Sequence, residues 1–322
     1  LRRDPDGLGL VKVAEAAAIP GAGLKRLLAA SIRLVFASPV HGYEGSGRGF
    51  ELRFRSVLQQ TMPQWRELRL SAPARWAEGD PLETLVNETF LLDAELAAVQ
   101  RDDAVVIEAI EPSRLVLDEA LLRSAFGLLI NAHYQTRPSD LRQLLDNPDV
   151  QLWLARLGDT VLGVLLASDE GGFDPGMVEQ ILAGRRRPRG HLLPQSLAVH
   201  AGLDPILRLR TLRIQRIAVH PGIQRCGIGR RLVERAGEWA VEQRFDLLGS
   251  AYGVDLSLLS FWHALGFSPV RMGVRIDPAS AAHSLFMLRG LSPSGSDLEA
   301  SGSNDFQTGL PWALAASLRG LD

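Results

Sequence analysis

Residues 216–231 read RIAVHPGIQRCGIGRR, with two glycines two positions apart between a strand-like run and a helix-like run. Backbone N–H groups in such a turn converge on one point at the positive end of the helix dipole, where they bind phosphate oxygens. Flanking arginines add charge that reaches the same oxygens. The spacing therefore predicts a pyrophosphate-binding loop. Its expected members are Gln224, Arg225, Cys226, Gly227, Ile228, Gly229 and Arg230.

Two familiar phosphate-binding loops do not fit this segment. A P-loop ends its glycine-rich turn with Gly-Lys followed by Ser or Thr, and no lysine follows Gly229. A dinucleotide-binding turn needs a third glycine early in a strand–helix–strand unit, and that glycine is missing. The expected ligand is therefore a pyrophosphate of another kind.

The pattern Gln-x-x-Gly-x-Gly after a strand resembles the acetyl-CoA loop of the GNAT N-acetyltransferase superfamily. The segment FWHALGF at 261–267 resembles that fold too, as does the expected order of hairpin, strand, loop, helix, strand, helix and two strands. The resemblance implies an acetyl-CoA site, with the pantetheine arm along the backbone of Ile217, Ala218 and Val219. It also implies an N–H near Val219 that polarises the thioester carbonyl, where negative charge develops as an amine attacks.

Three side chains are candidates for acid–base catalysis, and each has a structural alternative. His220 follows the strand directly and either faces the acceptor pocket or caps the turn before Pro221. Tyr252 follows a later strand and either protonates the leaving thiolate, as the resemblance implies, or lines the core. Glu170 lies in a Glu-Gly-Gly segment and either orients the base or shapes a turn. Cys226, the single cysteine, has no evident histidine partner and is not expected to act as a nucleophile.

Longer segments resemble the tRNA(Met) cytidine acetyltransferase family across residues 10–290. They are PVHGYEGSGRGF at 39–50, RWAEGDPL at 75–82, HYQTRPSDL at 133–141, DEGG at 169–172, RRPRG at 186–190 and RIAVHP at 216–221. Members of this family resemble a RecA-like ATPase fused to a GNAT domain and a tRNA-binding tail. The resemblance implies acetyl transfer to the exocyclic amine of the wobble cytidine of elongator tRNA(Met), with acetyl-CoA and ATP. His133 and Tyr134 are then expected on the substrate side.

The resemblance is incomplete at the nucleotide site. The family has Asp-Glu where this chain has Ala14 and Glu15, and alanine cannot hold the water shell of Mg²⁺. We therefore expect no ATP hydrolysis by this chain, although ATP and Mg²⁺ belong to the intact family. Arg48 matches the arginine that faces ATP there and is the nucleotide-binding candidate. Relative to the family, the chain is expected to be truncated at both ends.

Charge and composition limit the classes of function. Residues 184–235 contain twelve arginines against two acids, whereas residues 78–119 contain twelve acids against two arginines. Such asymmetry indicates either an anionic partner, such as tRNA, or two solvated faces that compensate each other. The chain has no apolar run of membrane-spanning length, no signal-peptide pattern and one cysteine. These features predict a cytoplasmic protein with no membrane contact and no bound metal.

The periodicities predict an α/β chain in three parts. Residues 1–104 are expected to form a partial RecA-like helicase-type region, residues 105–290 an α+β GNAT acyltransferase domain, and residues 291–322 a flexible tail. The tail is rich in Ser, Gly and Asp up to about residue 305, and the apolar patch at 310–318 has a docking helix as its alternative. In the second part the expected strands are 105–110, 150–157, 160–168, 211–219, 246–251, 269–275 and 282–289, and the expected helices are 118–133, 139–146, 194–201, 226–243 and 255–265. In the first part we expect a strand at 65–71 and a helix at 82–100.

Three functions remain open at this point. The leading hypothesis is a tRNA cytidine acetyltransferase, in whole or as its acetyltransferase part. The second is a GNAT N-acetyltransferase that acts on a protein or a small amine. The third is a catalytically silent remnant that binds only CoA or RNA.

Overall fold

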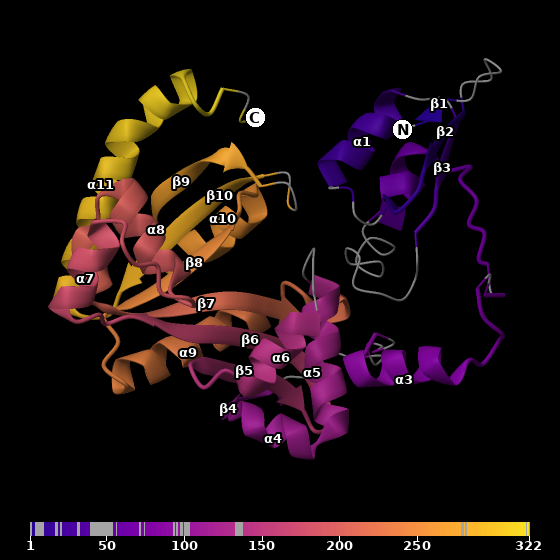
Figure 1. Ribbon diagram of the computed structural model, residues 1–322, viewed down its shortest axis with the longest axis horizontal. Coiled ribbons are helices and arrows are strands. Elements are labelled where there is room, and N and C mark those ends of the chain that lie inside the picture. The colour runs from indigo at the N-terminus through magenta and orange to yellow at the C-terminus, as the bar shows by residue number, and fades with distance from the viewer. Residues whose placement is uncertain are drawn as a thin grey trace. The chain divides into compact units, whose positions relative to one another are not determined.

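The computed structural model describes most of the chain in two compact units, each described below by itself (Figure 1). The described residues are 2–3, 10–16, 19, 21–30, 33–38, 54–55, 57–70, 72–73, 75–92, 94, 96, 99, 104–132, 138–277, 280, 282–319 and 321. Arg48, His133 and Tyr134, singled out from the sequence, lie outside these residues. No helix in the described part is long and apolar enough to cross a bilayer.

The first unit comprises Leu1–Ala98, Leu115–Asp146 and Pro278–Ala281. Its sheet has the order β1-β2-β3, and β2 and β3 are parallel with α1 between them in the chain. The bounds are β1 (Arg2–Arg3), β2 (Leu10–Val13), α1 (Gly21–Ala30), β3 (Arg33–Phe36), α3 (Pro81–Phe90), α5 (Glu119–Ala132) and α6 (Pro138–Asp146). Leu24 and Leu28 of α1 are buried in one cluster with Phe54. A parallel strand–helix–strand unit with this core fits an α/β region.

Two expectations for this unit are wrong. No strand forms at 65–70, because a strand requires a partner for its backbone hydrogen bonds and neither sheet of the described residues includes this segment. The helix expected at 82–100 is shorter, because Leu91 adopts a left-handed conformation with φ of 54° and ends α3. By their contacts α5 and α6 group with this unit, and the domain expected at residues 105–290 stays a prediction.

The second unit comprises Val99–Arg114, Asn147–Asp277 and Ala282–Asp322 and is built on a seven-stranded sheet of order β4-β5-β6-β7-β8-β10-β9. The bounds are β4 (Val106–Ile110), β5 (Val150–Leu157), β6 (Thr160–Gly171), β7 (Arg210–Val219), β8 (Leu247–Gly253), β9 (Ser268–Ile276) and β10 (His283–Gly290). Only β7 and β8 pair in parallel; their neighbours pair antiparallel. The strands expected from the sequence are confirmed, and so is the expected GNAT order.

Helices cover both faces of this sheet (Figure 1). One face packs against α9 (Ile228–Glu242) and α10 (Leu256–His263). The other packs against α7 (Pro175–Leu182), α8 (Leu192–Ala201) and α11 (Pro293–Ala315). The short helices are α4 (Pro112–Leu117) and two 3₁₀ turns, η2 (Asp204–Leu207) and η3 (Pro221–Ile223). We call these two surfaces of the sheet the α9 face and the α8 face.

The flexible tail expected at 291–322 is wrong, because α11 is a regular helix of 23 residues. The helix packs along β9 and β10. A Cβ at Gly295 would collide with the carbonyl oxygen of Asp246, and a Cβ at Gly302 would lie 2.9 Å from Leu203. The glycines that suggested disorder therefore let the helix approach the sheet closely.

Candidate functional site

The parallel pair β7 and β8 separates halfway along its length. Their pairing runs from Thr211 with Leu247 to Ile214 with Ser250 and then stops. Beyond that point β7 stays paired with β6 up to Val219, and β8 stays paired with β10 up to Gly253. The two strands therefore diverge and leave a gap in the sheet, bordered by backbone groups.

The backbone of β7 directs hydrogen-bonding groups into this gap. The N–H of His220 donates to Leu162 O of β6, at 2.8 Å. Because backbone groups of successive strand residues point to opposite sides, the N–H of Val219 points away from β6 and toward β8. The Val219 carbonyl points the same way and accepts from Gln224 Nε2 at 3.2 Å. The end of the strand and the loop after it are thus tied together at the gap.

The loop after β7 leaves the first turn of α9 open. Arg225 and Gly227 both have left-handed backbones, with φ of 60° and 82°, so the chain turns sharply around Cys226. Gly227 is the N-cap of α9 and no described side chain caps the helix. The N–H groups of the first turn therefore need an outside acceptor. Among the described residues, Arg230 pairs only with Glu234, at a long 3.7 Å, and both side chains are about half exposed.

The aromatic segment 261–267 supports this loop from α10. A Cβ at Gly229 would lie 3.4 Å from the Phe261 ring and 3.7 Å from Val219 Cγ2, both ordinary van der Waals contacts. Trp262 is buried, with its ring 5.2 Å from that of Phe261 and 4.9 Å from that of Phe267. The Phe261 ring and the end of β7 thus both pack beside the start of α9.

Tyr252 lies in β8, beyond Ser250, in the part that has separated from β7. Its ring stacks on Trp262 with centroids 6.2 Å apart, and its hydroxyl lies 2.9 Å from Met287 Sδ. Burial, and secondarily the charge of Asp255, raises the pKa of the Tyr252 phenol above its usual value. The hydroxyl therefore keeps its proton over a wider pH range than an ordinary tyrosine, and it donates that proton to Met287 Sδ.

His220 adopts the capping arrangement that was its structural alternative. Its Nδ1 accepts a hydrogen bond from the N–H of Gly222 at 3.2 Å and caps η3. This bond fixes the ring beside Pro221 at the start of the loop. His220 therefore holds the turn that carries the chain from β7 into the loop.

Glu170 is placed differently from the expectation, because it lies in β6 and not in a loop. Its side chain is fully buried. Glu170 Oε1 accepts from Arg213 Nη1 at 3.0 Å and from Ser168 Oγ at 3.2 Å, and Oε2 accepts from the N–H of Leu193 at 2.9 Å. Gln215 Nε2 donates to Ser168 Oγ at 2.9 Å. The carboxylate thus joins β6, β7 and α8.

Sequence reasoning missed Ser168, Arg213 and Gln215 as members of this group. The available signal was the presence of polar residues at alternate positions of two otherwise apolar strands. No group of three or more His, Cys, Asp or Glu in the described residues has an arrangement suited to a metal ion.

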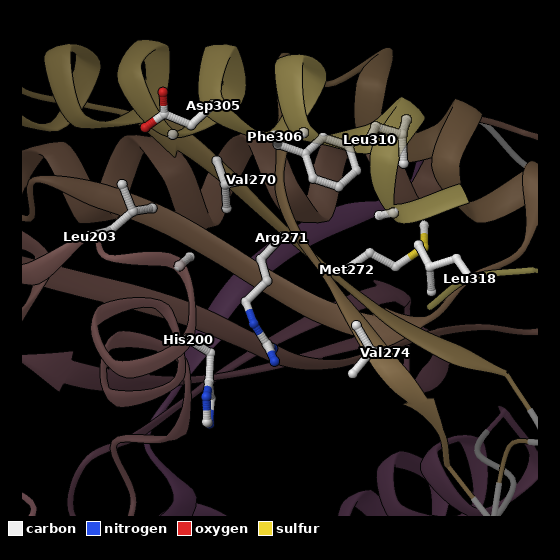
Figure 2. Close-up of a pocket in the computed structure, with 14 residues that line it drawn as sticks. His200, Leu203, Val270, Arg271, Met272, Val274, Asp305, Phe306, Leu310 and Leu318 are labelled. Atoms are coloured by element: carbon white, nitrogen blue, oxygen red, sulfur yellow. The ribbon is translucent and has the colours of Figure 1, made fainter. Parts of the chain in front are cut away.

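A separate pocket of about 210 Å³ lies between α8, β9 and α11 (Figure 2). Val270, Arg271, Met272 and Val274 line it from β9, and Asp305, Phe306 and Leu310 line it from α11 (Figure 2). Burial lowers the pKa of Arg271. None of the loop or gap residues described above contributes to it. This pocket is therefore distinct from the site at the β7–β8 gap.

Comparison with known proteins identifies both parts of the chain. Residues 2–93 match the family profile "RNA cytidine acetyltransferase NAT10/TcmA, helicase domain", and residues 124–243 match "GNAT acetyltransferase 2". The tRNA(Met) cytidine acetyltransferase TmcA of Nitrosococcus halophilus is 46% identical over 318 residues, covering 97% of this chain and 43% of that protein. TmcA of Vibrio cholerae is 42% identical over 293 residues, covering 90% and 41%. TmcA of Haloferax volcanii is 37% identical over 316 residues, covering 96% and 41%.

The chain spans less than half the length of these relatives. Within that span it carries a helicase-domain match at residues 2–93 followed by a GNAT acetyltransferase match at residues 124–243. The GNAT match includes β7 and the loop at the start of α9, whereas β8 follows it in the chain. The chain belongs to the tRNA(Met) cytidine acetyltransferase family, of which it contains part of the helicase domain and the acetyltransferase domain.

Proposed function

We propose that this chain transfers an acetyl group from acetyl-CoA to the exocyclic amine of the wobble cytidine of elongator tRNA(Met). The observation that carries the proposal is the gap between β7 and β8 next to an uncapped helix N-terminus. The relatives described as tRNA(Met) cytidine acetyltransferases supply the acceptor. Since the chain spans less than half of those proteins, both activity and acceptor are proposed for it here.

The donor site fits the chemistry of acetyl-CoA. The open N–H groups of the first turn of α9 suit a pyrophosphate, and nothing described lies within 4 Å of the space in front of Gly227. The strand edge at Ile217, Ala218 and Val219 suits the amide groups of a pantetheine arm. Arg225 and Arg230, both exposed, lie at the loop and are proposed to contact phosphate oxygens.

Two groups of the chain are proposed to act on the reacting atoms. Acetyl-CoA supplies a thioester whose carbonyl oxygen gains negative charge when the amine attacks. A backbone N–H of β7 near Val219 that points into the gap is proposed to donate to that oxygen. The Tyr252 hydroxyl, which donates to Met287 Sδ in this structure, is proposed to turn and give its proton to the departing sulfur, while the proton that the amine loses returns to the phenolate.

The segment between α7 and α8 supports an RNA acceptor. Arg185, Arg186, Arg187 and Arg189 are exposed and form no ion pair with any described residue. Exposed guanidinium groups without acidic partners are suited to RNA phosphates. A wobble cytidine lies in a single-stranded loop and can leave its stack for a pocket. With tRNA as acceptor, we place the reaction in the cytoplasm.

We further propose that this chain does not hydrolyse ATP. Ala14 directly follows β2, at the position where the sequence resemblance has an aspartate. A methyl side chain offers no oxygen to Mg²⁺ or to its water shell. Glu15 has a φ of 50°. It matches the glutamate of the family's Asp-Glu pair, so it does not take the place of the missing aspartate.

The test is acetyl transfer from labelled acetyl-CoA to elongator tRNA(Met), with and without ATP. We expect label on the wobble cytidine at the same rate in both conditions. Label on a protein or a free amine, with none on the tRNA, would contradict the proposed acceptor while leaving the donor site intact. A chain that binds acetyl-CoA by calorimetry but labels nothing would contradict the activity itself.

A further inference from the structure

Four polar side chains form a connected row on the α8 face at the point where β7 leaves β8. They are Gln215, Ser168, Glu170 and Arg213, joined by the three hydrogen bonds given above. The bond from the N–H of Leu193 to Glu170 fixes the row to the first turn of α8. The donor loop begins α9 on the opposite face, so this row lies on the other side of the sheet.

The hydrogen bonds of the row fix the orientation of Gln215. A carboxylate only accepts, so Glu170 takes the single hydroxyl proton of Ser168. Ser168 Oγ can then only accept from Gln215, and it does so from Nε2 at 2.9 Å. Gln215 Oε1 is therefore turned away from Ser168. Within the described part of the chain, no donor lies within hydrogen-bond distance of that oxygen.

Gln215 also occupies a special position in the strand. Ala167 pairs with Ile214 and Leu166 with Arg216, which leaves Gln215 as the extra residue of a β-bulge. Ile214 is the last residue of β7 that pairs with β8. Bulges bend a strand and redirect a side chain, and they occur often beside active sites. The half-buried Gln215 therefore follows the last residue of β7 that pairs with β8, and Ser168 of β6 orients its amide.

We infer that Gln215 Oε1 accepts a hydrogen bond from the acceptor amine, the exocyclic amine of a cytosine that enters the gap from the α8 face. Ser168, Glu170 and Arg213 are positioning residues that hold this oxygen in place. The inference rests on the proposed function. It adds the element that recognises the acceptor, on the face opposite the donor loop.

The chemistry of the amine explains why an amide suits this position. An amino nitrogen conjugated with a pyrimidine ring keeps its N–H bonds in the ring plane and attacks along the perpendicular. A hydrogen bond in the plane to Gln215 therefore holds the nitrogen without covering its attacking side. The N–H becomes more acidic as the new C–N bond forms, so this bond is stronger in the transition state than in the ground state. A neutral amide adds no negative charge beside the thioester oxygen.

The experiment compares Gln215→Leu with Gln243→Leu, a matched change at an exposed glutamine at the end of α9. The acceptor is an anticodon stem-loop RNA with a wobble cytidine. The readouts are kcat, the KM for acetyl-CoA and the acetyl-CoA dissociation constant from calorimetry. We expect kcat of Gln215→Leu to fall about tenfold, the effect of one hydrogen bond, with both acetyl-CoA constants unchanged. Gln243→Leu should match the unaltered chain.

A second variant, Ser168→Ala, removes only the hydroxyl that anchors Gln215. The Gln215 amide can then rotate and exchange its oxygen and nitrogen. We therefore expect kcat to fall by less than in Gln215→Leu, again with unchanged acetyl-CoA binding. Equal kcat in Gln215→Leu and Gln243→Leu would overturn the inference. A loss of acetyl-CoA binding in Gln215→Leu or in Ser168→Ala would also overturn it. An unaltered chain that binds acetyl-CoA but leaves the RNA unlabelled removes the proposed function, and the inference with it. If Gln215→Leu does not fold, Ser168→Ala decides.

Discussion

Arg213 Nη1 donates to Glu170 Oε1 across 3.0 Å, and the Glu170 side chain has no exposed surface. The Arg213 side chain is only 15% exposed, so each charge depends on the other. Removing one partner of a buried pair leaves an uncompensated charge in the interior. This pair joins the two central strands β6 and β7 just before β7 separates from β8.

Glu170→Gln should therefore lower the free energy of unfolding by about 3 kcal/mol. The matched control is Glu238→Gln, which removes a carboxylate paired with Arg235 while 63% exposed, and should cost less than about 1 kcal/mol. Chemical denaturation followed by tryptophan fluorescence measures both. A Glu170→Gln protein as stable as the control, yet inactive, would support the catalytic reading of Glu170 instead.

Gly227→Ala should weaken acetyl-CoA binding. The residue has φ of 82°, which costs a residue with a Cβ about 1–2 kcal/mol, and relief of that strain shifts the first turn of α9. Gly158→Ala is the control, because Gly158 also has a positive φ of 57° and open space around it but lies in the β5–β6 turn. Calorimetry should show a higher acetyl-CoA dissociation constant for Gly227→Ala only. Equal affinities in both variants would argue against the loop as the pyrophosphate site.

Tyr252→Phe should lower kcat about 100-fold and leave acetyl-CoA binding unchanged, because it removes a proton donor but no packing surface. The raised pKa of Tyr252 keeps its proton on at pH values where an ordinary tyrosine, with a pKa of about 10, begins to lose it. The rate of the unaltered chain should therefore show no decline from tyrosine ionisation up to about pH 10. A Tyr252→Phe protein with full kcat would leave Tyr252 as a core residue.

Asp255→Ala should destabilise α10 by about 1 kcal/mol, because Asp255 Oδ1 caps the N–H groups of Ser257 and Leu258 at 2.8 and 3.2 Å. The bond from Ser257, and then those backbone bonds, lower the pKa of Asp255 against the opposing effect of burial. Because its pKa is lowered on folding, the Asp255 carboxylate stabilises the folded state at pH values above the ordinary aspartate pKa. This stabilisation is lost as the pH falls through the lower pKa of the folded state. The difference between Asp255→Ala and the unaltered chain should therefore shrink in acid.

Asp174→Ala removes the equivalent cap of α7, where Asp174 Oδ1 accepts from Met177 N at 3.0 Å, and gives the control. Thermal unfolding should report a similar loss for both variants. Only Asp255→Ala should also weaken acetyl-CoA binding, because α10 carries the Phe261 ring beside Gly229. An effect of both caps on binding would show that the stability loss alone is responsible.

Local signals were sufficient for much of the second unit. The hairpin of β5 and β6 was predictable because two apolar runs flank Gly158 and Asp159, and the turn requires the positive φ of Gly158. The start of α9 was predictable because Gly227 and Gly229 precede an amphipathic run whose buried members include Leu232 and Ala236. These elements depend on neighbours in the chain, so their pattern is visible in the sequence.

In the candidate site, too, local parts were predictable from the sequence and long-range parts were not. The loop from Gln224 to Arg230 was readable because its geometry is local. The row of Gln215, Ser168, Glu170 and Arg213 was not, because Ser168 and Gln215 are 47 positions apart and meet only through strand register. The bulge at Gln215 depends on the pairing of β6 with β7, which no local pattern specifies.

By itself, the sequence determined the order of the acetyltransferase elements along the chain, the loop at the start of α9 and the resemblance to the family. Only the tertiary structure decided where polar side chains meet and whether the C-terminal segment folds. The Ser- and Gly-rich composition of 291–305 predicted disorder, yet α11 forms because Gly295 and Gly302 let it pack closely against the sheet and its adjoining loops. Burial against β9 and β10 supplies the stabilisation that the helix lacks in its own composition.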